Sequence, residues 1–388
     1  MPPFKQQGRD VSAGPRKFHR WDDGDVQIPH HLLPKDGRFG SGPAKVRGEA
    51  VDHLLAHADV LGTSHRKPPV RQLVGRVQSM LAELYQLPDG YEVVLGNGGA
   101  SQVWDMAVCS LVEHRSAHGV FGEFGGKFAR AAEDAPFLAD PFVTCAPAGQ
   151  VALPEASDAD VHAWAHNETS TGAQAPVRRI GDGLVLVDGT SAAGGIPVDL
   201  RETDLYYFAP QKNFSSDGGL WIAFASPAAI ERAERIAATD RWIPRMLSFT
   251  SAVTNSRKQQ TLNTPSITTL LLLEAQLAWM LELGGLDVVA ERCRRSSSIL
   301  YRWAEQHAFA QPFVADPAHR SPVVATIDLD ACVDAAYLIA LLRDNGIVDV
   351  DPYRSLGRNQ LRIGCYASVD PEDVEALTDC LNHLIERL

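Results

Sequence analysis

The sequence lacks several patterns that would point to a metal, a nucleic acid or an oxidising compartment. Its six cysteines are scattered and form no CxxC pair, which disfavours a structural zinc and is typical of reduced thiols in a cytosolic protein. Basic residues number 36 against 48 acidic ones, and the net charge of −12 argues against nonspecific binding to nucleic acid or anionic membranes. We therefore expect no metal, no nucleic-acid partner and a cytoplasmic location.

Long apolar segments are also missing. The most apolar window, residues 267–283, is short for a membrane span and contains Glu274 and Glu282, so we expect a buried helix and no membrane partner. No apolar stretch follows the basic residues of the N-terminus, which disfavours a secretory signal. Residues 1–35 are expected to form a polar N-terminal extension.

Short apolar runs recur between residues 91 and 226, with a clear helical pattern at 102–112 and weaker ones between the later runs. This alternation predicts an α/β domain over residues 36–285, built around a mainly parallel seven-stranded sheet. The strands are expected at 92–95, 119–121, 142–145, 163–165, 184–187, 205–208 and 220–224.

A smaller α+β domain is expected over residues 286–388. The glycine pair at 284–285 ends one helix, and residues 286–306 read as a long helix that leads out of the larger domain. The expected elements after it are strands at 323–329, 348–350 and 360–365, a helix at 335–344, and a last helix from Pro371.

Two residues at predicted strand ends carry the strongest chemical signal. Asp188 and Lys212 lie 24 residues apart, each just after a buried apolar run, where ligand groups collect in parallel sheets. Pyridoxal phosphate requires such a pair: a lysine amine that forms a Schiff base and a carboxylate that keeps the pyridine nitrogen protonated. A lone Asp or Lys is usually a turn former or a surface charge, but the chain has only eight lysines, and their pairing favours a site.

A glycine-rich turn follows the first predicted strand. Residues 96–101 (GNGGAS) lead from this strand into the helix at 102–112, an arrangement that directs backbone N–H groups at a phosphate. A degraded dinucleotide fingerprint with Glu123 as the ribose acid is the alternative. It fits less well, because Ser101 replaces the third glycine and Asp188 and Lys212 are left without roles.

Nearly the whole chain after the extension resembles the fold-type-I pyridoxal-phosphate aminotransferases, and within them the phosphoserine aminotransferases of the actinobacterial branch. The resemblance rests on motifs in the family's order rather than on any one of them. They are FGSGP at 39–43, SHR at 64–66, GGAS at 98–101, NET at 167–169, DGTS at 188–191, QKN at 211–213, NTP at 263–265, YRS at 353–355 and LR at 361–362.

The resemblance implies a role for each matched residue toward the cofactor. Lys212 would bind the cofactor and carry the proton, Asp188 would pair with the ring nitrogen, and Thr169 would bond the phenolic oxygen. Phe124 would stack on the ring, with Trp104 as a competing candidate. The phosphate would be held by Gly99, Ala100, Ser101 and Gln211, joined by Asn263 and Thr264 of the partner subunit; Ala100 departs from the arginine of the best-known members.

For the substrate, the resemblance implies two separate anion sites. Arg362 would grip the α-carboxylate in a bidentate fork. His65, Arg66 and Arg354 would meet the substrate phosphate or the side-chain carboxylate of glutamate, with Ser41 also at this site. The resemblance implies that His65 and Arg66 come from the partner subunit. Tyr353 stands where the family often has a histidine, and it carries no positive charge.

The implied enzyme is a homodimer with shared active sites. It would transfer the amino group of L-glutamate to 3-phosphohydroxypyruvate, giving 2-oxoglutarate and O-phospho-L-serine, in serine biosynthesis and by family analogy in pyridoxine biosynthesis. Two alternatives stay open: an alanine–glyoxylate or serine–glyoxylate aminotransferase, and a noncatalytic ligand-binding relative. The basic residues His65, Arg66 and Arg354 argue against the first, and Lys212 argues against the second.

Overall fold

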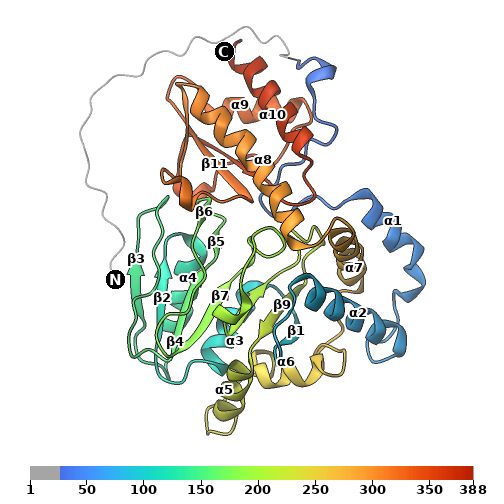
Figure 1. Cartoon of the computed structure of the whole chain (residues 1–388), viewed down its shortest axis with the longest axis vertical. Helices are drawn as coiled ribbons and strands as arrows, with labels where there is room; N and C mark the ends of the chain where they lie inside the picture. The colour runs from blue at the N-terminus through green and yellow to red at the C-terminus, as the bar shows by residue number, and fades with distance from the viewer. Residues whose placement is uncertain (1–26, 388) are drawn as a thin grey trace.

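The structure is a computed structural model that describes residues 27–387. Its larger part is a seven-stranded sheet covered by helices, and a smaller C-terminal unit, orange to red in Figure 1, lies against one end of it. The strand order is β1-β9-β8-β7-β4-β2-β3. The strands are β1 (Glu92–Asn97), β2 (Ser116–Val120), β3 (Phe142–Cys145), β4 (Val161–Ala165), β7 (Leu184–Asp188), β8 (Leu205–Phe208) and β9 (Leu220–Ala225).

Most neighbouring strands of this sheet are parallel, and only β9 runs against both of its neighbours. Alternate residues of each strand face opposite sides, so Val185 and Val187 of β7 enter one apolar core, whereas Leu184 and Leu186 enter the other. Burial on both faces explains why β7, β8 and β9 are nearly continuous apolar runs. The fold is therefore the α/β architecture that the sequence predicts.

Two groups of helices cover the two faces of the sheet (Figure 1). One core includes residues of α2 and α7, which pack against each other, and α1 packs on α7. The other core includes residues of α3, α4, α5 and α6. The helices are α1 (Gly48–Ala56), α2 (Pro68–Leu84), α3 (Ala100–Ser110), α4 (Glu123–Glu133), α5 (Pro227–Ala237), α6 (Phe249–Ser256) and α7 (Ile267–Glu282).

The smaller unit packs three helices against an antiparallel three-stranded sheet, with strand order β10-β11-β12. Its elements are α8 (Leu286–Gln306), β10 (Ala310–Pro312), β11 (Val324–Leu329), α9 (Ala335–Asp344), β12 (Gln360–Gly364) and α10 (Pro371–Ile385). Ile28 and Phe39, far away in sequence, belong to the same apolar core. A short two-stranded ribbon, β5 (Asn167–Glu168) with β6 (Ala173–Gln174), follows β4.

Residues 27–387 also contain six short 3₁₀ helices. They are η1 (His30–Leu32), η2 (Ala58–Val60), η3 (Leu200–Glu202), η4 (Arg245–Leu247), η5 (Pro317–His319) and η6 (Arg354–Leu356). Among residues 27–387 no single helix has the length and composition of a membrane span; α7 and α8 pass that test only as a pair bent by 92°.

Each of the seven strands expected in the large sheet is present, and the helices expected at 286–306 and 335–344 have those bounds. The strand expected at 348–350 is wrong: Val348 forms only an isolated parallel bridge with Arg38. Asp349 has a left-handed backbone with φ of 65°, which ends pairing after one residue. Residues 1–26 of the expected extension lie outside the described residues, and the domain boundaries stay predictions.

Candidate active site

Lys212 lies in the loop after β8, at the carboxyl end of the strand. Its amine donates a hydrogen bond to the carbonyl oxygen of Ser41 at 2.9 Å, and the hydroxyl of Tyr366 donates to the same oxygen at 2.7 Å. A Cβ atom at Gly42 would lie 1.7 Å from the Lys212 nitrogen, so only glycine leaves room for the amine. Burial, aided by the positive charge of Arg362, lowers the pKa of Lys212 to about 8.

Asp188 is the last residue of β7, the parallel neighbour of β8. One carboxylate oxygen accepts a hydrogen bond from the indole nitrogen of Trp104 at 3.2 Å, and the other accepts from the backbone N–H of Thr190 at 2.9 Å and from its hydroxyl. Burial raises the pKa of Asp188, against these donors. The negative charge of Asp188 acts in the opposite direction to burial on the pKa of Lys212, since it favours the protonated amine.

Phe124 lies in the first turn of α4 and lines a narrow pocket together with Asp188. Glu168 holds this turn in place: its buried carboxylate accepts hydrogen bonds at 3.1 Å from the backbone N–H groups of Phe124 and Gly125. The hydroxyl of Ser170 donates to the same carboxylate at 2.7 Å. Acceptance of helix N–H groups by a carboxylate stabilises both the helix and the position of the Phe124 ring.

The helix α3 begins at Ala100 directly after β1 and the glycine turn. Gly98 has φ of 111°, a conformation that suits glycine, and Gly99 is the N-cap residue without any capping side chain. A Cβ at Gly99 would meet no atom within 4 Å, so the helix N-terminus is open to a ligand. The buried side-chain oxygen of Gln211, beside Lys212 in sequence, has no hydrogen-bond partner.

Arg362 lies on β12 and reaches out of the smaller unit. Its guanidinium donates long hydrogen bonds of 3.4 Å to the backbone carbonyls of Thr169 and Asp351. The ring of Tyr353 lies 5.2 Å from the guanidinium carbon. Burial lowers the pKa of Arg362, and among residues 27–387 it has no Asp or Glu in ion-pair contact. It is therefore a cation with its hydrogen-bond fork available to an anion.

The residues expected from the partner subunit lie together, away from this group. His65 makes a 3.1 Å hydrogen bond with the hydroxyl of Thr264, and the side-chain amide of Asn97 donates to the carbonyls of Asn263 and Thr264. Among residues 27–387, no hydrogen bond or ion pair joins His65, Arg66, Asn263 or Thr264 to Lys212 or Asp188. Arg66, Asn263, Thr264, Ser101 and Arg354 are exposed.

Comparison with known proteins identifies the chain's relatives. The model of the class-V aminotransferase family matches residues 148–377. The phosphoserine aminotransferase of a Nocardioides species is 56% identical over 370 residues, which cover 94% of this chain and 99% of that protein. The chain belongs to the phosphoserine aminotransferase family. The resemblance drawn from the motifs is thus confirmed over nearly the whole sequence.

Solved structures place this family member in the same fold. A phosphoserine aminotransferase from Cytophaga hutchinsonii matches with a TM-score of 0.83 at 22% identity, covering 89% of this chain and 99% of that one. An alanine–glyoxylate aminotransferase from a Nostoc species matches with a TM-score of 0.76, also at 22% identity, covering 93% and 98%. The fold-type-I architecture is confirmed, but the fold alone does not separate these two activities.

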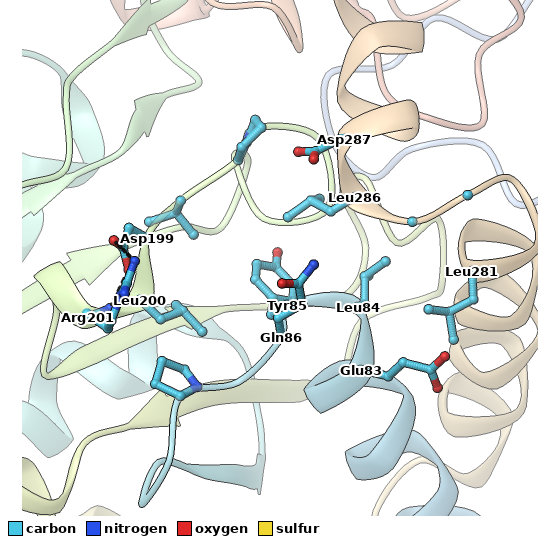
Figure 2. Close-up of a pocket in the computed structure, with 15 residues that line it drawn as sticks. Glu83, Leu84, Tyr85, Gln86, Asp199, Leu200, Arg201, Leu281, Leu286 and Asp287 are labelled. Atoms are coloured by element: carbon cyan, nitrogen blue, oxygen red, sulfur yellow. Dashed lines mark hydrogen bonds and ion pairs between the residues drawn. The ribbon is translucent and has the colours of Figure 1, made fainter.

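A large open pocket of this aminotransferase lies elsewhere. It has a volume of about 940 Å³ and opens between the end of α2, the 197–201 segment and the α7–α8 junction (Figure 2). Its charged side chains are Glu83, Asp287 and the ion pair of Asp199 with Arg201. None of the predicted site residues lines it.

Three residues that take part in this arrangement carried no clear sequence signal. Trp104 was a candidate for stacking on the cofactor, yet its indole N–H binds Asp188. Tyr366 was not singled out, because its partner Ser41 is 325 residues away in the sequence. Glu168 belongs to a recognised motif, but its function as the cap of α4 depends on a contact across 44 residues.

Proposed function

We propose that this family member is a pyridoxal-phosphate-dependent phosphoserine aminotransferase that transfers the amino group of L-glutamate to 3-phosphohydroxypyruvate. The products are 2-oxoglutarate and O-phospho-L-serine. The observation that carries the proposal is the pairing of Lys212 and Asp188 at adjacent strand ends in a chain that is 56% identical to a named phosphoserine aminotransferase. The two-domain division, the cytoplasmic location and the place in serine and pyridoxine biosynthesis are part of this proposal.

The residues of the site fit the proposed cofactor. The open N-terminus of α3 at Gly99, Ala100 and Ser101 offers backbone N–H groups to a phosphate, and the unpaired oxygen of Gln211 lies one residue from Lys212. Ala100 has no charged side chain, so the phosphate depends more on the helix dipole and on neighbouring hydroxyl groups. When bound, the cofactor supplies an electron sink for negative charge at the substrate Cα.

The protein's own contribution begins with Lys212. An amine with a pKa of about 8 is partly neutral near physiological pH, which suits both covalent attachment and later proton transfer at the substrate Cα. The Ser41 carbonyl, which accepts its hydrogen bond, gives the released amine a defined position. Asp188 would accept a hydrogen bond from the cofactor's ring nitrogen, while Trp104 and Thr190 hold the carboxylate from the other side.

Substrate recognition is divided between two places. Arg362 has no acidic partner among residues 27–387 and would bind the α-carboxylate through its two-pronged fork, beside Thr169, which would face the cofactor's phenolic oxygen. The exposed Arg354 and Arg66, with His65, would bind the substrate phosphate. This basic group favours a phosphorylated acceptor over glyoxylate, which has no distal anion.

We also propose a homodimer with shared active sites. Among residues 27–387, the cluster of His65, Thr264, Asn263 and exposed Arg66 makes no hydrogen bond or ion pair with Lys212, which agrees with a cluster that serves the neighbouring subunit. A Lys212→Ala chain mixed with a chain altered at both 65–66 and 263–264 should form heterodimers with one intact site. Activity approaching half of wild type per heterodimer supports sharing; inactive, cofactor-loaded heterodimers refute it.

The proposed reaction is tested by following the amino group itself. Purified holoprotein is given ¹⁵N-labelled L-glutamate with equal concentrations of 3-phosphohydroxypyruvate and glyoxylate. We expect the label in O-phosphoserine, in large excess over glycine, by mass spectrometry. Label mainly in glycine would favour the alanine–glyoxylate type of activity, and label in neither product would favour a noncatalytic relative.

A further inference from the structure

Arg362 is a half-buried cation that has no ion-pair partner among residues 27–387. Its two hydrogen bonds are long, 3.4 Å each, and both go to backbone carbonyls. The ring of Tyr353 lies against the guanidinium, with the guanidinium carbon 5.2 Å from the ring centroid. An aromatic face stabilises a guanidinium without neutralising it and without using its N–H groups. The fork of Arg362 therefore stays available for a ligand.

Tyr353 makes a second contact, with the proposed cofactor-stacking residue. The rings of Tyr353 and Phe124 lie 6.2 Å apart at an angle of 63°, an edge-to-face arrangement that aromatic pairs favour. Phe124 is itself held by the carboxylate of Glu168 at the start of α4. Tyr353 thus lies between the ring of Phe124 on α4 and the guanidinium of Arg362 on β12.

We propose that Tyr353 is a positioning residue that orients Arg362 toward the substrate α-carboxylate, rather than a ligand of the substrate phosphate. This inference rests on the proposed transamination and deepens it. A histidine at this position would, when protonated, repel the adjacent guanidinium, whereas tyrosine is neutral and offers a larger face. The ring, not the hydroxyl, is the part of Tyr353 that performs this function.

Two variants, Tyr353→Phe and Tyr353→Leu, distinguish the contribution of the Tyr353 ring to substrate binding from that of its hydroxyl. Tyr353→Phe keeps the aromatic face, so its half-saturation concentrations for glutamate and for 3-phosphohydroxypyruvate should stay within about twofold of wild type. Tyr353→Leu should raise both by roughly 3- to 30-fold, because both substrates carry an α-carboxylate. Maximal half-reaction rates, followed by the cofactor's visible absorbance, should change much less. 2-Methylglutamate has no Cα proton to lose, so it binds without being transaminated. Its dissociation constant therefore compares the same variants at equilibrium.

The Arg362→Ala protein tests whether Tyr353 acts through Arg362. In Arg362→Ala protein, adding Tyr353→Leu should change 2-methylglutamate binding by less than about twofold, since the residue being positioned is absent. The inference is overturned if Tyr353→Phe is as impaired as Tyr353→Leu, if only the phosphorylated substrate is affected, or if the Leu effect persists without Arg362. Wild-type protein that converts glutamate but not 3-phosphohydroxypyruvate overturns the proposed acceptor and leaves the glutamate comparison valid. Wild-type protein that accepts no amino acid overturns both.

Discussion

The contact between Trp104 and Asp188 yields the sharpest test of how the site is built. Asp188 is buried, so each donor to its carboxylate contributes to keeping it ionised. Trp104→Phe preserves an aromatic side chain on α3 and removes the N–H that lies 3.2 Å from the carboxylate. A hydrogen bond to a charged group contributes about 1.5–3 kcal/mol, and Thr190 still supplies two donors, so the loss should lie near the lower value.

This change should weaken cofactor binding by about tenfold, because a more basic, partly protonated Asp188 holds the cofactor's ring nitrogen less well. Fluorescence titration of the apoprotein with pyridoxal phosphate measures the dissociation constant directly. Trp303→Phe is the matched control, since it also loses a buried indole hydrogen bond, to Asn382 at 2.8 Å in the smaller unit. Unchanged cofactor affinity in a folded Trp104→Phe protein, or an equal loss in the control, would refute the reasoning.

Three further outcomes are expected. Lys212→Ala should abolish turnover but still bind the cofactor noncovalently. Borohydride reduction of the wild-type holoprotein should attach the cofactor only to the peptide that contains Lys212, and a label on Lys127 would refute the assignment. Covalent attachment of the cofactor to the apoprotein should increase as pH rises through about 8, where Lys212 loses its proton. Arg362→Ala should move the midpoint of this pH dependence upward, because it removes a positive charge that lowers the pKa of Lys212. An unmoved midpoint would contradict an effect of Arg362 on Lys212. Arg354→Ala should raise the half-saturation for 3-phosphohydroxypyruvate about tenfold more than for an unphosphorylated 2-oxo acid, and equal losses exclude a phosphate role.

Much of the large sheet could be predicted because its central strands, such as β7, β8 and β9, are buried on both faces. Such strands are continuous apolar runs, and the run at 205–208 coincides with β8 residue for residue. Strand ends then indicate where Asp188 and Lys212 lie, without any knowledge of tertiary contacts. The prediction fails at 348–350, where Asp349 interrupts the apolar residues and adopts φ of 65°. Backbone conformation of that kind is decided by the surrounding fold.

The partners of the site residues could not be predicted, because each depends on a contact between distant segments. Nothing near Trp104 in the sequence indicates that its indole reaches Asp188, 84 residues later. Tyr353 was noted only as a departure from the family pattern, and its position between Phe124 and Arg362 depends on how the smaller unit packs on the sheet. Residue identity revealed the chemistry, and tertiary structure revealed what positions it.

The central claim is that Lys212 and Asp188 form the core of a glutamate-to-phosphohydroxypyruvate aminotransferase. It is tested most directly by the absorbance spectrum of purified holoprotein during two successive additions. We expect a visible cofactor band that glutamate discharges and that 3-phosphohydroxypyruvate then restores, with both changes absent in Lys212→Ala. A wild-type protein without such a band, or a band that glutamate discharges and 3-phosphohydroxypyruvate fails to restore, would contradict it.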